Sequence, residues 1–175
     1  MSPIEFRREL HRHPELSFAE YNTAEFIESA LAAEGIACRR VADTGVLAVL
    51  EGRGDTKRAV VLRADIDALP ITEATGLEYA SENEGVMHAC GHDMHAAVLF
   101  GALQRLSRER NFEGTIFGLF QPGEECTPGG ASKVLADNHL RVTMWLRLLE
   151  IIQTLPLRWV RLACVRGHLW RRMTS

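Results

Sequence analysis

The sequence has no apolar run near the roughly 18–20 residues that a membrane-spanning helix needs. Its first ten residues, MSPIEFRREL, lack the hydrophobic core of an export signal. We therefore expect a cytoplasmic location and no membrane partner. The 46% hydrophobic share over 175 residues is ordinary for a globular domain with a full core.

Cysteine is scarce and widely spaced. Without an export signal, this usage argues against a framework of disulfides and favours free thiols or metal ligands. The four cysteines are Cys38, Cys90, Cys126 and Cys164.

Lysine is missing from residues 139–175, and the charge of the chain changes sign where that segment begins. Residues 1–138 hold 22 acidic and 13 basic residues, whereas 139–175 hold seven arginines, one glutamate and all three tryptophans. Such a basic segment can bind nucleic acid or an anionic membrane surface. We favour the simpler interpretation that this segment did not evolve together with residues 1–138, and we expect no nucleic-acid partner.

Helix and strand signals alternate along the chain. Two capping boxes, Ser2-Pro3-Ile4-Glu5 and Ser17-Phe18-Ala19-Glu20, predict helix starts, and Gly35 ends the second helix. The alternation predicts an α/β fold with a mixed, largely covered sheet and flanking helices. Strands are predicted at 37–41, 46–50, 59–66 and 115–120, and helices at 96–106, 129–135 and, by apolar density, 140–157.

The stretch GVMHACGHDMH gathers three histidines, one cysteine and one aspartate into residues 88–95. Cys90 and His92 are separated by one residue, and in an extended segment such residues point the same way. Both side chains can then bind one cation, and His88 and His95 can add to the set. A cysteine and a histidine suit zinc, or manganese, cobalt or nickel if carboxylates complete the shell.

The paired acids Glu124 and Glu125 follow the strand predicted at 115–120. Because neighbouring side chains on an extended chain diverge, one carboxylate can bind metal while the other stays free as a general base. A competing interpretation makes Cys90 a nucleophile with a histidine as its base. The crowding of imidazoles beside a carboxylate pair favours metal.

Asp65 and Asp67 lie at the end of the strand predicted at 59–66. They can orient an imidazole ligand from outside the ligand shell, or simply accept hydrogen bonds in a turn. Other polar candidates are expected to serve packing or capping: Cys38, Cys126, His11 and His13.

Four segments carry a family resemblance in the same order: LHRHPELSFAE, TGVLAVLEG, VLRADIDALPITEATGLEYASENEGVMHACGHDMHAAVLFGAL and FQPGEE. Over about residues 5–138 the chain resembles the metal-dependent aminoacylase/carboxypeptidase family. The matching branch contains hippurate hydrolases, N-acyl-L-amino-acid amidohydrolases and plant auxin-conjugate hydrolases. The resemblance implies two divalent metal ions, manganese or zinc, with cobalt or nickel as alternatives, and a small-molecule N-acyl amino acid substrate.

The resemblance also implies residue roles. Cys90, His92 and Glu125 match metal ligands, Glu124 matches the general base, and Asp67 matches an aspartate that orients a ligand. The implied reaction is hydrolysis of an amide to a carboxylic acid and an amino acid. Two further positions are Asp65, where related branches have a metal-binding histidine, and His95, whose family role we do not assign.

The resemblance stops near Asn138. From His139 onward the sequence matches neither the further histidine ligands of the family nor its inserted lid and dimerisation domain. We therefore divide the chain into 1–138, the N-terminal part of a catalytic domain, and 139–175, a basic segment read from a shifted frame. We expect a truncated protein with weak or no activity and without the family's dimer contact; the alternative is a non-catalytic remnant.

Overall fold

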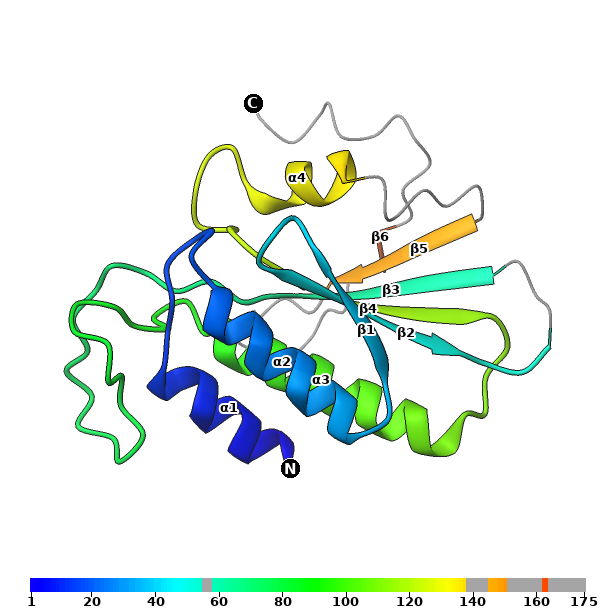
Figure 1. Cartoon of the computed structure of the whole chain (residues 1–175), viewed down its shortest axis with the longest axis horizontal. Coiled ribbons are helices and arrows are strands. Elements are labelled where there is room, and N and C mark those ends of the chain that lie inside the picture. The colour runs from blue at the N-terminus through cyan, green and yellow to red at the C-terminus, as the bar shows by residue number, and fades with distance from the viewer. Residues whose placement is uncertain (55–57, 138–144, 151–161, 164–175) are drawn as a thin grey trace.

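The computed structural model describes residues 1–54, 58–137, 145–150 and 162–163. Four helices and six strands alternate within these residues, which confirms the predicted mixed α/β class (Figure 1). The elements are α1 (Pro3–Arg12), α2 (Tyr21–Ala33), β1 (Ala37–Val41), β2 (Gly45–Glu51), β3 (Arg58–Asp65), α3 (His92–Glu109), β4 (Thr115–Gln121), α4 (Gly130–Ala136), β5 (Trp145–Glu150) and β6 (Leu162–Ala163).

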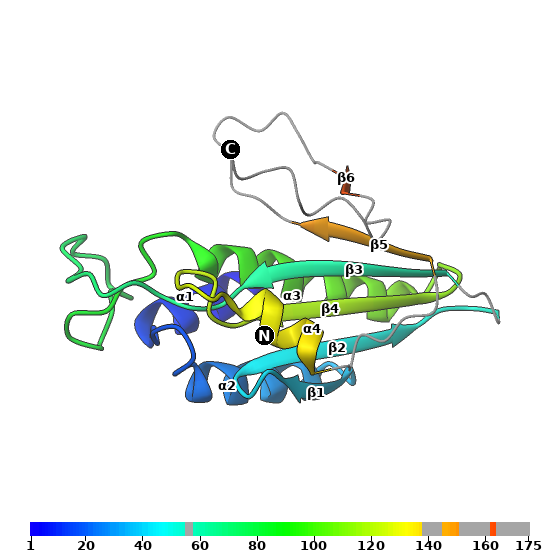
Figure 2. The ribbon, with the colours of Figure 1, turned by 90° about the horizontal axis from the view of Figure 1, so that it is seen from above.

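The strands form one sheet in the order β1-β2-β4-β3-β5-β6. Strands β3, β4 and β5 run parallel, whereas β1–β2, β2–β4 and β5–β6 pair antiparallel. Seen from above, β5 lies beyond β3, on the side away from β4 (Figure 2). The parallel centre places the carboxyl ends of β3 and β4 at one edge, where Asp65 pairs with Gln121.

Two apolar clusters hold the layers together, one on each face of the sheet. Helices α1, α2 and α3 cover one face, where Phe6 of α1 stacks on Phe100 of α3 with ring centroids 4.3 Å apart. Helix α4 covers part of the other face, where Val134 packs with Leu47 and Leu119. Alternate residues of β2 therefore point into different clusters, as the period of a strand requires.

The helix starts test the two predicted capping boxes. The first is confirmed: the backbone N–H of Glu5 donates to Ser2 Oγ, and the N–H of Ser2 donates to the Glu5 carboxylate. The second is wrong: α2 begins at Tyr21, and its N-cap, Glu20, makes no side-chain capping bond. The side chains of Ser17 and Glu20 instead make long-range contacts around the candidate site.

The helix predicted at 140–157 is wrong where the structure describes that segment, because residues 145–150 form strand β5 against β3. Pairing with β3 satisfies the backbone N–H and C=O groups along one side of that strand. An apolar run in the sequence does not show that such a partner strand is available. Of residues 139–175 the structure describes 145–150 and 162–163, so Cys164 lies outside the described residues. The three cysteines within them, Cys38, Cys90 and Cys126, are free thiols.

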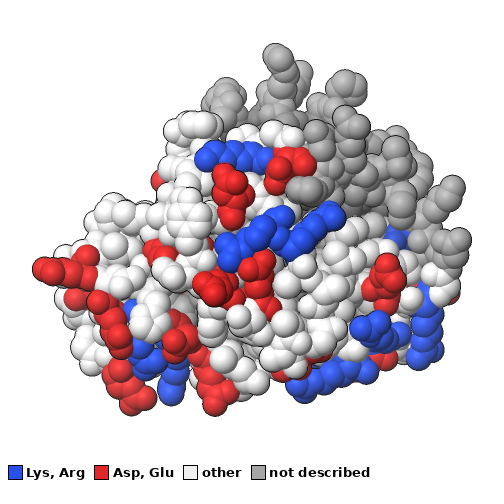
Figure 3. All heavy atoms as spheres, in the orientation of Figure 1, with Lys and Arg blue, Asp and Glu red and all other residues white. Residues whose placement is uncertain are grey.

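The described helices include none that is long and apolar enough to span a bilayer. On the face of the described residues drawn in Figure 3, acidic and basic side chains are interspersed. That face does not show the one-signed basic surface that typifies nucleic-acid binding.

Candidate metal site

The candidate site lies at the carboxyl ends of β3 and β4, beside the first turn of α3. The loop after β3 carries Asp67, and the turn after β4 carries Glu124 and Glu125. Because the two strands are parallel and adjacent, these acidic residues reach the same edge of the sheet. Helix α3 begins there with His92, directly after Cys90 and Gly91.

Cys90, His92 and Glu125 come together at this edge. One ligand atom from each lies within 4.8 Å of the other two. Glu125 Oε1 is 3.8 Å from His92 Nε2, and Glu124 Oε2 is 3.9 Å from the same nitrogen. Both carboxylates thus lie near the same nitrogen, so they diverge less than neighbouring side chains on an extended chain. They differ in exposure: the Glu124 side chain is 45% exposed and that of Glu125 is 22% exposed.

The backbone that joins Cys90 to His92 is not extended, so the predicted geometry of that pair is wrong. Gly91 has φ +85°, and His92 is already the first residue of α3. A left-handed glycine followed by a helix start turns the two side chains towards each other by a different path. The sequence pattern found the pair but not the turn that joins it.

Asp67 is fully buried and fixes neighbouring residues of the site through hydrogen bonds. Its Oδ2 accepts hydrogen bonds from Ser17 Oγ (2.7 Å) and from the backbone N–H of Glu125 (2.9 Å). His92 Nδ1 lies 2.9 Å from the Asp67 carbonyl oxygen and 3.1 Å from Oδ1. Since both neighbours are acceptors, Nδ1 carries the proton and Nε2 is left to bind a cation.

These contacts shift the pKa values of both partners. Burial alone would raise the pKa of Asp67, but the hydrogen bonds from His92, Glu125 and Ser17 outweigh it and lower that pKa. Burial would lower the pKa of His92, but the hydrogen bonds to Asp67 and the negative charges of Asp65 and Asp67 together outweigh it and raise that pKa. The Asp67 carboxylate is thus held ionised against the imidazole.

Cys90 has the wrong electrostatics for a nucleophile. Burial first, and then its hydrogen bond to Glu125 and the charges of Glu125 and Glu124, raise the pKa of the Cys90 thiol to about 12. Reactive cysteines have a lowered pKa because positive groups surround them. A ring of negative charge favours a cation instead, which argues against the nucleophile interpretation.

Glu20 is a buried residue of the site that the sequence patterns missed. Its carboxylate accepts hydrogen bonds from Thr44 Oγ1 (2.6 Å) and from the backbone N–H of Gly123 (2.8 Å). These bonds hold the turn that leads into Glu124. Burial raises the pKa of Glu20. A lone glutamate in a capping pattern resembles a surface residue, so only the long-range contact reveals it.

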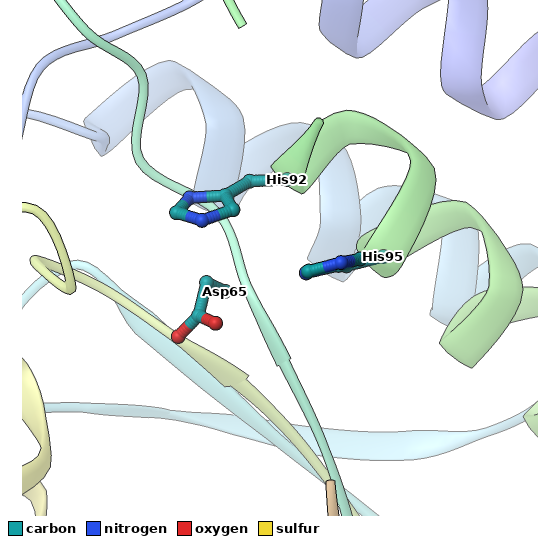
Figure 4. Close-up of side chains that lie close together, drawn as sticks. All are labelled: Asp65, His92 and His95. Atoms are coloured by element: carbon teal, nitrogen blue, oxygen red, sulfur yellow. The ribbon is translucent and has the colours of Figure 1, made fainter. Parts of the chain in front are cut away.

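Asp65, His92 and His95 form a second group whose ligand atoms lie within 4.8 Å of one another. Figure 4 shows the three side chains converging from the end of β3 and the first turn of α3. The Arg63 guanidinium lies 2.5 Å from Asp65 Oδ1. Burial raises the pKa of Asp65 to about 6, although Arg63 opposes the shift.

A buried polar network lies behind the site, between α1 and the loop before α3. His11 Nδ1 is 2.8 Å from Asp93 Oδ2, and His11 Nε2 is 3.1 Å from Glu73 Oε1. Arg7 Nε is 2.6 Å from Asp93 Oδ2. The expectation that His11 serves packing or capping therefore understated its role, because both of its ring nitrogens face carboxylates. His88, near this network, is also buried, which lowers its pKa to about 4.

Together these contacts define a mixed α/β protein with a candidate metal site at the ends of parallel strands. The chain belongs to peptidase family M20/M25/M40, whose family model matches residues 61–158. That match extends past residue 138, where we placed the end of the catalytic part. The division at 138 stays a prediction.

Two relatives carry names that describe an activity. N-acetyl-L-cysteine deacetylase of Bacillus subtilis (strain 168) is 50% identical over 139 residues, 78% of this chain and 33% of that protein. N-acyl-L-amino acid amidohydrolase of Geobacillus stearothermophilus is 48% identical over 134 residues, 75% of this chain and 36% of that protein. The chain thus spans about a third of the length of these curated relatives.

A crystal structure of the Bacillus subtilis YXEP protein, described as a dinuclear metal-binding peptidase of the M20 family, superposes with a TM-score of 0.77 at 44% identity. The match covers 82% of this chain and 41% of that one. An aminobenzoyl-glutamate utilization protein from Klebsiella pneumoniae, with a TM-score of 0.60 at 18% identity, shares the fold.

Proposed function

We propose that this chain supplies the metal-binding part of an amidohydrolase that cleaves the amide bond of N-acyl amino acids. The observation that carries the proposal is the meeting of Cys90, His92 and Glu125, with the Glu124 carboxylate beside them. The names of these two relatives support this substrate class. Since the chain spans about a third of their length, the activity of the whole protein is part of the proposal.

The donors present fit a divalent cation. A thiolate, an imidazole and a carboxylate are the ligands that zinc takes in proteins, and manganese, cobalt and nickel accept the same nitrogen and oxygen donors. Cys90, His92 Nε2 and Glu125 would hold the ion. Two ions are part of the proposal, because the related Bacillus subtilis structure is described as dinuclear.

When bound, the metal supplies a polarised amide carbonyl and a water of lowered pKa. The chain supplies the orientation and the proton transfer. Asp67 holds the ring of His92 so that Nε2 faces the donors, and it fixes the Glu125 backbone. Glu124 accepts the proton of the attacking water and returns it to the leaving amine nitrogen, which yields a carboxylic acid and an amino acid.

The test compares the chain with Glu124→Gln, which removes the base and keeps its size. Both proteins are loaded with Zn²⁺ or Mn²⁺ and assayed for hydrolysis of N-acetylcysteine and N-benzoylglycine (hippurate). We expect equal metal content and turnover in the wild type alone, below the ordinary enzyme range of about 1–1000 per second. A wild type no faster than Glu124→Gln would refute hydrolysis by this site.

The second candidate function is a non-catalytic remnant that binds a divalent metal weakly. It is favoured by the number of donors, because each group in the described residues offers three ligands. Structural zinc sites use four protein ligands, and a two-metal site needs more. Equal and negligible hydrolysis by both proteins, together with metal binding, would support this candidate.

A further inference from the structure

We infer that Phe18 is a positioning residue for the turn that carries Glu124 and Glu125. Phe18 lies in the loop between α1 and α2, and its ring packs on Gly123, the residue before Glu124. The roles of Glu124 as base and Glu125 as ligand rest on the proposed function. The contact between Phe18 and Gly123 is independent of it.

The backbone of Phe18 has an unusual conformation. Its φ is +62°, in the left-handed region. The N–H of Ala19 donates to the carbonyl oxygen of Leu16 at 2.9 Å, so Phe18 is the third residue of a tight turn, where a positive φ favours glycine or asparagine. A bulky residue in this region is sterically unfavourable and persists only where its surroundings fix it. The advantage of phenylalanine at this position must therefore come from its ring.

Hydrogen bonds hold the residues on both sides of Phe18. Before it, Ser17 Oγ donates to Asp67 Oδ2 at 2.7 Å. After it, the buried Glu20 carboxylate accepts the N–H of Gly123 at 2.8 Å. The first bond ties the loop to the residues after β3, and the second ties it to the turn after β4. Together they explain how the strained backbone of Phe18 is maintained.

The Phe18 ring lies directly against the backbone of Gly123. A Cβ added to Gly123 would lie 2.6 Å from both Cε1 and Cζ of that ring, so only a glycine allows the approach. Over the ring lies Lys133 of α4, with Nζ 3.3 Å from the ring centroid, a cation–π contact. The Gly130 N–H, also of α4, donates to Gly123 O at 2.7 Å. The ring thus joins the turn after β4 to the helix that follows it.

Glu124 lies between two fixed points of the backbone. On one side Gly123 packs on Phe18, and on the other the N–H of Glu125 donates to Asp67 Oδ2 at 2.9 Å. Loss of the first point leaves the second in place. The Glu124 carboxylate should then move away from the metal site, whereas Glu125 should move less.

Two substitutions separate the ring of Phe18 from its backbone. Phe18→Gly removes the ring and relieves the strain, since glycine adopts a positive φ freely, whereas Phe18→Ala removes the ring and keeps the strain. Phe26→Ala is the matched control. Phe26 is a part-buried phenylalanine of α2 that packs on Phe6, with ring centroids 5.1 Å apart.

The first measurement is backbone hydrogen exchange by NMR in the zinc-free, 175-residue chain. We expect both Phe18 variants to raise the exchange of the Gly123 and Gly130 N–H groups by about tenfold or more relative to the amides of β2. Phe26→Ala lowers the stability of the whole fold, so it should not raise these two selectively. Unchanged exchange at Gly123 in Phe18→Gly, or an equal selective rise in Phe26→Ala, would overturn the inference.

The second measurement compares zinc affinity with hydrolysis of N-acetylcysteine by the zinc-loaded chain. In both Phe18 variants, turnover should fall by about tenfold or more, because the base is displaced. Zinc affinity should fall less, because the Glu125 backbone stays bound to Asp67. Faster exchange at Gly123 with wild-type turnover would overturn the positioning role. A wild type without turnover would count against the proposed function, and hydrogen exchange alone would then decide the role of Phe18.

Discussion

The ring of His92 is held by Asp67 through two acceptors at once: the backbone carbonyl oxygen at 2.9 Å and the side-chain Oδ1 at 3.1 Å from Nδ1. The same aspartate accepts the backbone N–H of Glu125. One buried carboxylate therefore positions two of the three proposed ligands. Partners of this kind fix the tautomer and orientation of a ligand histidine.

We predict that Asp67→Asn lowers zinc affinity by about 10–100-fold with little change in fold. The amide keeps the size of the carboxylate but loses its charge, and it cannot accept at both oxygen positions. Competition with a chromophoric zinc chelator measures the affinity. Ser17→Ala, which removes one donor to the same carboxylate, is the control and should cause a smaller loss. Wild-type affinity in Asp67→Asn would show that Asp67 does not position the ligands.

The buried carboxyl of Glu20 predicts a pH-dependent stability difference. Burial raises its pKa above the ordinary value of 4.5, so the folded state retains a proton that the unfolded state has lost. The contribution of Glu20 to the free energy of unfolding is therefore fully present below pH 4.5. It is lost as the pH rises towards the pKa of Glu20 in the folded state. Glu20→Gln removes this ionisation but keeps one of the two acceptor oxygens, so it loses either the bond from Gly123 or the bond from Thr44 at every pH.

We therefore expect Glu20→Gln to gain stability relative to wild type as pH rises from about 4 to 8. Urea unfolding at several pH values measures the difference. A difference that stays constant with pH, or that shrinks as pH rises, would contradict the raised pKa.

The strands were predictable because their signal is local. The predicted ranges 37–41, 46–50, 59–66 and 115–120 each lie within one residue of the observed strand ends. Apolar runs bounded by turn residues carry that information in the sequence itself. Helix α3 was placed four residues late because its first turn is polar, and those polar side chains face the site rather than solvent.

The grouping of the three proposed metal ligands was predictable for another reason: Cys90 and His92 lie close together in the sequence, and the family resemblance supplied Glu125. The partners that support them were not. Glu20 reaches Gly123 across 103 residues, and His11 reaches Asp93 across 82. Nothing near a lone acidic or basic residue in the sequence marks it as buried, so only the assembled fold reveals these pairs.

Gly130 is a position where no side chain fits. A Cβ there would lie 1.7 Å from the carbonyl oxygen of Pro122, and the Gly130 N–H donates to Gly123 O at 2.7 Å. We predict that Gly130→Ala costs about 1–3 kcal/mol and also lowers zinc affinity, because it displaces the turn that carries Glu124 and Glu125. Thermal unfolding and zinc titration measure both effects.

Gly76→Ala is the matched control for that prediction. Gly76 has φ +69° and nothing within 4 Å of an added Cβ, so alanine there brings backbone strain of about 1–2 kcal/mol without a clash. Its zinc affinity should equal that of the wild type. If Gly130→Ala also keeps the wild-type zinc affinity, the position of α4 does not determine the geometry of the metal site.

The network around His11 predicts a large loss of stability from one substitution on α1. His11 lies between the carboxylates of Asp93 and Glu73, and its side chain is 3% exposed. Both ring nitrogens face carboxylate oxygens, at 2.8 Å for Asp93 and 3.1 Å for Glu73. His11→Ala leaves two buried carboxylates with one fewer partner, which typically costs about 3–5 kcal/mol.

His13→Ala is the control, because that histidine is two residues away, half-exposed and paired only with Glu9 in the described residues. Its effect should stay within about 0.5 kcal/mol. Urea unfolding of both variants at neutral pH gives the comparison. Similar small losses in the two would mean that the Asp93 and Glu73 carboxylates find other partners, such as Arg7, and that the network does not depend on the imidazole. A large loss confined to His11→Ala would establish that α1 anchors the turn of α3 from which His92 projects.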